Sequence, residues 1–567
     1  MRQDLFSECI GNIEKNINTQ YLKTQLSEVT AAAGQYIAKP IPPFRYSLFR
    51  IFGKTGSRTE YEQQYFERRR RLNAIAVGVL TDGGGKYAEA LEDIIWAVCD
   101  EYTWAVPAHI PENLGVENWG SFIDLFAAET GFALSEISHL LRNKLSAAVR
   151  SRIRFEVRRR IIMPYLGAKE NPFWWESFEN NWSAVCSGSV GAAFLYQGEE
   201  DEIKEVLPRI RESMKCFLNS FSEDGTCLEG YGYWAYGFGF FVSFAELLCQ
   251  YTNGKQDWFK WDKVKKTAMF QQNAVLNNGS VVSFSDSMTE YKHNMGLSQY
   301  LHSRFPEVIV PGVEYCSKFG DDRCYRWALF IRSLAWGGGE NESKINNRRV
   351  YLDKAGWYIY ENKAYSFAAK GGHNGEPHNH NDVGSFLICT NGSQIICDPG
   401  GGEYNKDYFG DKRYDFFTTS SRGHSVPIID GNYQKAGKMY SGTVIGSGEN
   451  EFKLELYKAY GYSKLKSLTR RFTLEDKAVT VSDTFLFSCE NHDITERFIV
   501  TEPPQCGENS VTAGNLKIAF DAALWKCETG EEVYKTICGE VKHAYLVDFR
   551  LPLTEKSISA EFKISVL

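Results

Sequence analysis

Histidines and carboxylates gather in one short part of the chain. Of only ten histidines, four fall within 52 residues: His373, His378, His380 and His424. In an extended strand His378 and His380 would point to the same face, and Asp382 and Asp398 lie close by in the sequence. Imidazole and carboxylate groups that converge suit a zinc-like ion. The sequence therefore predicts a metal site here, with hydrogen-bonded histidines in glycine-rich loops as the alternative.

A hairpin next to these histidines limits how they can share a metal. Asn391-Gly392 has the residue types of a two-residue type I′ turn, which would pair Ser385 with Asp398. His380 would then lie five residues further along and on the opposite face. A metal held by both His380 and Asp398 needs a bulge or break between them, for which Gly384 is the candidate. Without such a break, Asp382 is the better ligand.

Tyrosines with potential acid–base function occur in the segment SEDGTCLEGYGYWAYGFGF, residues 222–240. Tyr231, Tyr233 and Tyr236 alternate there with glycines and Trp234. A tyrosine hydroxyl in a cleft can act as general acid or base if its pKa is lowered. A purely structural aromatic cluster is the alternative interpretation.

Two asparagines stand between tryptophans in FWWESFENNWSAVCSGS. Asn180 and Asn181 could donate amide hydrogen bonds to an anionic group. An ordinary helix cap at either residue is the alternative.

The first part of the chain, to about residue 335, has helical periodicity. The segment 201–220 places its apolar residues on one helical face, and the segments 59–80, 84–102 and 236–252 also look helical. Pro208 predicts that the helix in 201–220 starts or kinks there. A similar helical pattern runs over residues 121–160, with a turn expected near Gly131. Repeated helices of this length predict a helical toroid or solenoid.

After about residue 345 the period changes to two. SFLICT-NG-SQIICD and LTRRFTLEDKAVTVSDTFLF both have the pattern of hairpins, and SISAEFKISVL alternates to the C-terminus. We therefore predict an α+β multidomain chain: a helical domain over 1–336, an antiparallel β-sandwich over 348–567, a linker in 337–347 and a ligand cleft between the domains.

Composition excludes several classes of protein. A net charge of −7 disfavours a general nucleic-acid binder. The sequence has no run of 18 apolar residues, so no membrane-spanning helix is expected. The N-terminus has no pattern of a secretory signal, so the expected location is the cytoplasm. The 14 cysteines form no CxxC pair and are expected to be reduced.

The ordered motifs EGxxYWxYG, PHNHNDVGSF, CDPGG and RGHS together resemble the heparinase II/III-like polysaccharide lyases and the related oligoalginate lyases. The segments TWAVPAH (103–109) and IDLFAAETG (123–131) also look like toroid segments of that group. The resemblance implies an (α/α) toroid followed by a β-sandwich. It also implies a carbon–oxygen lyase that cleaves uronic-acid polysaccharides or oligosaccharides by β-elimination and leaves a 4,5-unsaturated uronate.

The resemblance further implies a role for individual residues. Asn181 would bind the substrate carboxylate, Tyr233 would be the acid and a candidate base, and His378 the partner base or carboxylate neutraliser. Tyr231 and Tyr236 stay open as rivals of Tyr233. The implied structural zinc ligands are His380, Asp398 and His424. The implied substrate-binding residues are Asn180, Trp182, Tyr236, Trp104 and His109.

The chain departs from this pattern at one position. Several relatives place a histidine directly after the asparagine, whereas Trp182 follows Asn181 here. If Asn180 is the equivalent residue, Asn181 occupies the histidine position. A positive neutralising group is missing in both alignments, so His378 or an arginine must compensate.

The expected partner is an anionic, uronate-containing saccharide, with glycosaminoglycans favoured over alginate. The basic run in residues 150–160 could contribute to its binding, or could be a solvated helix face. Two other functions fit the sequence. A toroid-fold glycoside hydrolase would use a carboxylate pair from Glu176, Asp224 and Glu229. A non-catalytic sugar-binding protein would need neither Tyr233 nor His378.

Overall fold

The computed structural model of the protein describes residues 4–82, 85–276, 279–338, 348–537 and 539–567. The chain divides into two compact units. The helical unit comprises Met1–Ser220, Trp234–Ala268 and Lys292–Ser343, and the sandwich unit comprises Phe221–Tyr233, Met269–Tyr291 and Lys344–Leu567. The sequence predicted one division, at the linker in 337–347. Two short segments before that linker, Phe221–Tyr233 and Met269–Tyr291, nevertheless belong to the sandwich unit. Most of that linker, residues 339–347, lies outside the described residues.

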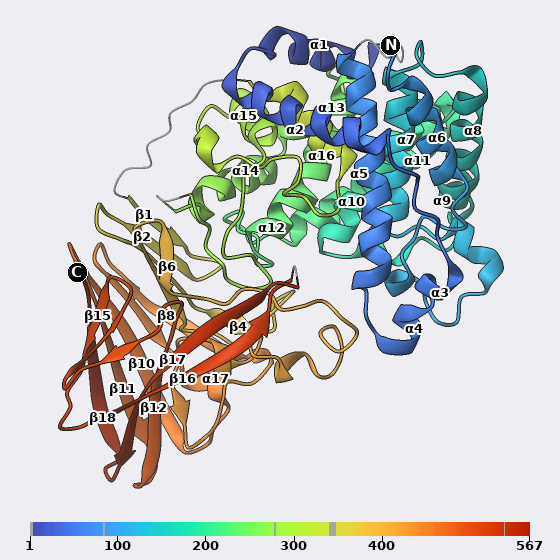
Figure 1. Ribbon diagram of the computed structural model, residues 1–567. Helices are drawn as coiled ribbons and strands as arrows, with labels where there is room; N and C mark the ends of the chain where they lie inside the picture. The colour runs from blue at the N-terminus through green and yellow to red at the C-terminus, as the bar shows by residue number, and fades with distance from the viewer. Residues whose placement is uncertain (1–3, 83–84, 277–278, 339–347, 538) are drawn as a thin grey trace. The chain divides into compact units, whose positions relative to one another are not determined.

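Helices form the first unit (Figure 1). They are α1 (Ser7–Asn16), α2 (Gln20–Tyr36), α3 (Tyr46–Phe49), α4 (Ile51–Thr55), α5 (Thr59–Thr81), α6 (Ala88–Cys99), α7 (Leu125–Leu140), α8 (Ala147–Val157), α9 (Met163–Gly167), α10 (Asn181–Gln197), α11 (Glu200–Asn219), α13 (Gly239–Tyr251), α15 (Met295–Arg304) and α16 (Trp327–Trp336), together with the first turns of α14 (Asp262–Ala274). Among the described residues, no helix combines the length and apolar character needed to cross a bilayer.

Helix α10 is the buried centre of this unit and packs against α7, α11 and α13. Its small residues permit this approach, because a Cβ on Gly191 would lie 2.5 Å from the ring of Phe244. The turn expected near Gly131 and a helix start at Pro208 were both wrong, whereas a kink at Pro208 stays a prediction. Gly131 lies inside α7, where a Cβ would meet Ile161 at 2.7 Å, so this glycine serves close helix packing rather than a turn. Helix α11 begins at Glu200 and contains Pro208 in its interior.

The second unit contains two antiparallel sheets with a shared apolar core (Figure 1). The first sheet has the order β1-β2-β3-β5-β6-β12-β17-β16, with β7 paired to β12, and the second has the order β13-β14-β15-β18-β11-β10-β9-β8-β4. The strands of the first sheet are β1 (Arg348–Leu352), β2 (Trp357–Glu361), β3 (Ser366–Lys370), β5 (Phe386–Thr390), β6 (Ser393–Ile396), β7 (Ile428–Ile429), β12 (His492–Val500), β16 (Lys526–Lys535) and β17 (Val541–Leu553). Those of the second are β4 (Gly372–Asn374), β8 (Gly437–Ser447), β9 (Glu451–Glu455), β10 (Leu465–Glu475), β11 (Ala478–Phe487), β13 (Gln505–Cys506), β14 (Ser510–Ala513), β15 (Leu516–Ala519) and β18 (Ser557–Val566).

Both predicted hairpins are confirmed. Asn391 and Gly392 have positive φ values of 47° and 88°, as a type I′ turn requires, and Thr390 pairs with Ser393 across them. Strands β10 and β11 pair from Glu475 and Ala478 outward. In β18 the alternate residues Ala560, Phe562 and Ile564 are buried, so one face of this strand lies on the core.

Candidate active site and metal centre

Asp286 is the centre of a polar cluster in the sandwich unit. This carboxylate is 2% exposed and lies in the segment Met269–Tyr291, before the sandwich strands in the sequence. Its hydrogen-bond donors are His378 Nδ1 at 2.7 Å, His380 Nε2 at 2.9 Å, Arg413 at 3.0 Å, Tyr408 at 2.5 Å and Tyr404 at 3.3 Å. Burial alone would raise the pKa of Asp286, but the two histidines and Arg413 hold it well below its usual value. Asp286 is therefore a fixed negative charge. We refer to it and its five donors as the Asp286 cluster.

His378 lies between two carboxylates. Its Nδ1 contacts Asp286, and its Nε2 is 3.4 Å from Oε2 of Glu229, a buried oxygen with no hydrogen-bond partner among the described residues. Burial lowers the pKa of His378, but the hydrogen bond to Asp286 and the charges of both carboxylates raise it above its ordinary value overall. The geometry thus favours the cationic imidazolium. The expected strand is not formed: His378 is in a turn with a φ of 54°.

Tyr233 lies against His378, with ring centroids 4.3 Å apart. Its hydroxyl is 2.6 Å from that of Tyr404, which in turn bonds Asp286. Burial and the charge of Asp286 raise the pKa of Tyr233, so its hydroxyl is protonated at neutral pH. The lowered pKa considered from the sequence is not found, and the arrangement suits a proton donor.

The two rival tyrosines have different surroundings. Tyr231 is buried, with its ring edge-on to Tyr291 at 4.8 Å. Tyr236 belongs to the helical unit, where its hydroxyl bonds Glu129 and the guanidinium of Arg326 lies 3.8 Å from its ring centroid. Of the three tyrosines, Tyr233 is the one beside the Asp286 cluster.

His380, Asp398 and His424 form a candidate metal centre. One ligand atom from each lies within 4.8 Å of the others, and all three side chains are buried. Within the described part of the chain, Nδ1 of His380 has no hydrogen-bond partner, and Nδ1 of His424 lies 3.1 Å from Oδ2 of Asp398 without a well-aligned hydrogen bond. The opposite ring nitrogens are held by Asp286 at 2.9 Å and by the Thr418 carbonyl at 2.9 Å. Because the opposite nitrogen of each ring is already held, Nδ1 of both histidines is left as the candidate ligand atom, as in metal-binding histidines. The three donors fit a divalent ion.

A break in the chain before β5 allows His380 and Asp398 to lie together despite the hairpin. Strand β5 begins only at Phe386, and Gly384 before it has a φ of 88°, so the chain that carries His380 is not part of the hairpin. A register shift in the pairing of β5 with β6 also moves Asp398 by one residue relative to the expected pairing. The alternative ligand Asp382 is instead paired with Lys370, whose Nζ lies 2.9 Å from its carboxylate. The break at Gly384 is thus where it was expected.

The helical unit holds the predicted asparagines. Asn180 is the N-cap of α10 and accepts a hydrogen bond from the Trp182 backbone at 3.0 Å, which is the structural alternative foreseen for it. Asn181 is the first residue of α10 and is 4% exposed. Trp182 packs on His109 with ring centroids 4.9 Å apart, and His109 Nδ1 bonds Asp124 at 2.8 Å.

Trp104 does not match its predicted role. It is 1% exposed, and its indole N–H donates to the Val98 carbonyl at 2.9 Å. This residue is part of the helical core and presents no surface to a saccharide.

The carboxylates of the hydrolase alternative have structural partners. Glu176 pairs with Arg209 at 2.7 Å, and Asp224 accepts bonds from Ser222, Thr226 and the Lys354 backbone. Glu229 is the one of the three beside His378.

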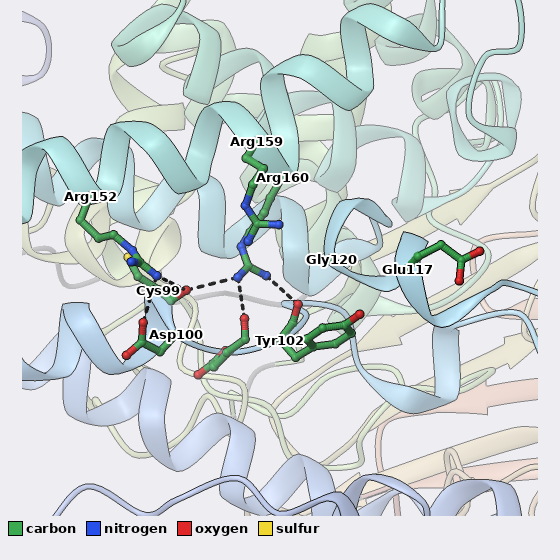
Figure 2. A pocket seen from close by; sticks show the side chains of 9 residues that line it. Cys99, Asp100, Tyr102, Glu117, Gly120, Arg152, Arg159 and Arg160 are labelled. Atoms are coloured by element: carbon green, nitrogen blue, oxygen red, sulfur yellow. Dashed lines mark hydrogen bonds and ion pairs between the residues drawn. The ribbon is translucent and has the colours of Figure 1, made fainter.

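The basic run is largely neutralised within the helical unit. Figure 2 shows Arg152, Arg159 and Arg160 at a cavity of about 290 Å³. All three pair with Glu156, at 3.2, 2.6 and 2.7 Å. Arg160 also donates to the carbonyls of residues 99, 101 and 102, so these guanidiniums serve the fold.

Sequence reasoning missed Asp286, Tyr404, Tyr408 and Arg413. Tyr404, Tyr408 and Arg413 lie in GEYNKDYFGDKRYD, within 16 residues of the start of the CDPGG motif. This proximity to the motif was the available signal that they belong to the site. Asp286 is 92 residues before His378 and had no such signal.

Comparisons with known proteins agree with this architecture. Residues 344–541 match the family described as "Heparinase II/III-like, C-terminal". The structure of heparinase III is similar with a TM-score of 0.65 and 15% identity, over 97% of this chain and 86% of that one. A heparan sulfate lyase HepC mutant from Pedobacter heparinus gives 0.59 and 14%, over 97% and 91%. Chondroitin AC lyase from Streptomyces coelicolor, in complex with chondroitin sulphate, gives 0.58 and 10%, over 100% and 82%. No curated protein matches the sequence.

At these identities the solved structures are evidence of a shared fold. They confirm the predicted helical toroid followed by an antiparallel β-sandwich. The family match covers the segment that carries His378 and the three candidate metal ligands. The resemblance to the heparinase II/III-like family is thereby confirmed for residues 344–541, whose sequence matches the heparinase II/III-like C-terminal family.

Proposed function

We propose that the protein is a polysaccharide lyase that cleaves uronate-containing saccharides by β-elimination, with glycosaminoglycans as the favoured class. The observation that carries this proposal is the group of Tyr233, His378 and Asp286, in which a protonated phenol lies against an imidazolium anchored by a carboxylate. The likeness to heparinase III and chondroitin AC lyase supports the same reaction class.

The reaction requires three tasks, and the charge states assign two of them. The C5 proton of a uronate becomes acidic only when its carboxylate is neutralised, and the leaving oxygen must be protonated. A raised pKa keeps His378 cationic, which suits neutralisation of the substrate carboxylate better than proton abstraction. A raised pKa keeps the proton on Tyr233, which suits its donation to the leaving oxygen.

Asn181 is the second proposed ligand of the substrate carboxylate. Its amide would supply a neutral donor to that carboxylate. This assignment rests on the family motif. It is tested by Asn181→Ala, with Asn180→Ala as a control for loss of the helix cap.

The metal is proposed to be zinc in a structural role. His380, Asp398 and His424 would hold it, and zinc would supply a fixed crosslink between the three segments that carry these residues. Two nitrogen ligands and one oxygen ligand suit zinc better than calcium or magnesium, which prefer oxygen ligands.

The test is a screen of heparan sulfate, chondroitin, hyaluronan and alginate oligosaccharides for a rise in ultraviolet absorbance from the new C=C bond. Tyr233→Phe and the matched control Tyr231→Phe are assayed beside the wild type. New reducing ends without a rise in absorbance would support the hydrolase. Saccharide binding without any cleavage would support a binding protein.

A further inference from the structure

Two cysteines meet where edge strands of the two sheets approach each other. Cys506 is on β13, the first strand in the order of the second sheet, and Cys527 is on β16, the last strand in the order of the first. Their Sγ atoms are 3.9 Å apart. We propose that Cys506 and Cys527 form a reversible disulfide that joins the two sheets of the sandwich at these edges.

The geometry permits the bond with a small movement. A disulfide needs its sulfurs about 2.05 Å apart, so the two sulfurs must approach by roughly 2 Å. Cys506 is exposed on a two-residue strand, where its side chain has room to rotate. Cys527 is half-buried and packs against the core of the sandwich, which fixes its position.

The two thiols differ in access, which gives the reaction an order. Burial and the neighbouring thiol raise the pKa of Cys527 to about 12, so Cys506 is the first nucleophile. Its thiolate attacks one sulfur of a low-molecular-weight disulfide such as oxidised glutathione and releases one glutathione thiolate. Cys527 then loses its proton to solvent, its sulfur attacks Sγ of Cys506, and the second glutathione thiolate leaves. Two cysteine thiols are thus oxidised while one external disulfide is reduced to two thiols.

The consequence is a crosslink between two positions that are 21 apart in the sequence, with β14 and β15 between them. Closing such a segment restricts the unfolded chain and stabilises the folded sandwich. Edge strands are also the places where a sheet opens or pairs with another chain. Oxidation would therefore stabilise the sandwich unit, and reduction would restore the more easily unfolded form.

The experiment uses the full-length protein after incubation with oxidised glutathione or with a dithiol reductant. Peptide mapping without reduction should find one intramolecular crosslink between Cys506 and Cys527. The melting temperature of the oxidised protein should be higher than that of the reduced one by at least about 5 °C. Cys489→Ser is the matched control, because Cys489 is a partly exposed cysteine of the same unit, and it should retain the crosslink.

The single variants distinguish the order of attack. Cys527→Ser should keep one glutathione on Cys506, because no second thiol can displace it, and Cys506→Ser should acquire neither glutathione at residue 527 nor the crosslink. Wild type that carries glutathione on Cys506 without a 506–527 crosslink would overturn the proposal. So would a crosslink that leaves the melting temperature unchanged.

Discussion

His378 and His380 are two residues apart and bond the same carboxylate, yet we predict that only His380 holds metal. His380→Ala should abolish metal binding, because it removes one of the two imidazole ligands. It also removes a buried hydrogen bond of 2.9 Å to the charged Asp286, which is worth about 1.5–3 kcal/mol. A loss of about 2 kcal/mol lowers the melting temperature of a unit of this size by roughly 4–8 °C.

His378→Ala also removes a hydrogen bond to Asp286, at 2.7 Å, so its melting temperature should fall as well. The basal melting temperature therefore does not separate the two variants. The decrease in melting temperature on addition of a chelator does separate them, because a metal that binds only the folded state adds stability that the chelator removes. We expect this decrease in wild type and in His378→Ala, and no decrease in His380→Ala.

The assay is elemental analysis of purified protein beside thermal unfolding with and without chelator. His373→Ala is the matched control, since His373 is a partly exposed histidine of the same segment outside the metal cluster. The reasoning is refuted if His380→Ala keeps a full equivalent of metal. Equal loss of metal from both variants would make His378 a ligand and would remove it as the group that neutralises the substrate carboxylate.

Three further outcomes follow from the Asp286 cluster. Tyr233→Phe should lower turnover at least about 10²-fold, as expected for loss of a general acid, with unfolding nearly unchanged; activity within a few-fold of wild type would contradict the assignment. Tyr404→Phe removes the 2.6 Å hydrogen bond to Tyr233 and should lower kcat by roughly 2–10-fold, the effect of one hydrogen bond, and an effect as large as that of Tyr233→Phe would make Tyr404 the acid. The pKa of His378 is raised, so its cation is present below that pKa and is lost as pH rises through it. kcat/KM should therefore fall on the alkaline side in a pH profile, whereas a rise through the same range would identify His378 as a neutral base.

Features that depend on near neighbours could be read from the sequence. The hairpin at Asn391-Gly392 is one, because positive φ at both positions favours these residue types in any context. The alternation of β18 and the apolar face of α11 are others, since period and burial are linked along a single element. The motif order was also sufficient to indicate the family, which the match over residues 344–541 confirms.

Features that depend on distant residues needed the tertiary structure. Gly131 suggested a turn, but it allows α7 to contact Ile161, and this contact is invisible to a local pattern. The segment Met269–Tyr291 precedes the sandwich strands yet belongs to their unit, and it carries Asp286. That carboxylate unites His378, Tyr404 and Arg413 across separations of 92 to 127 residues. The protonation states of Tyr233 and His378 follow from burial and from these charges, which only the folded chain brings together.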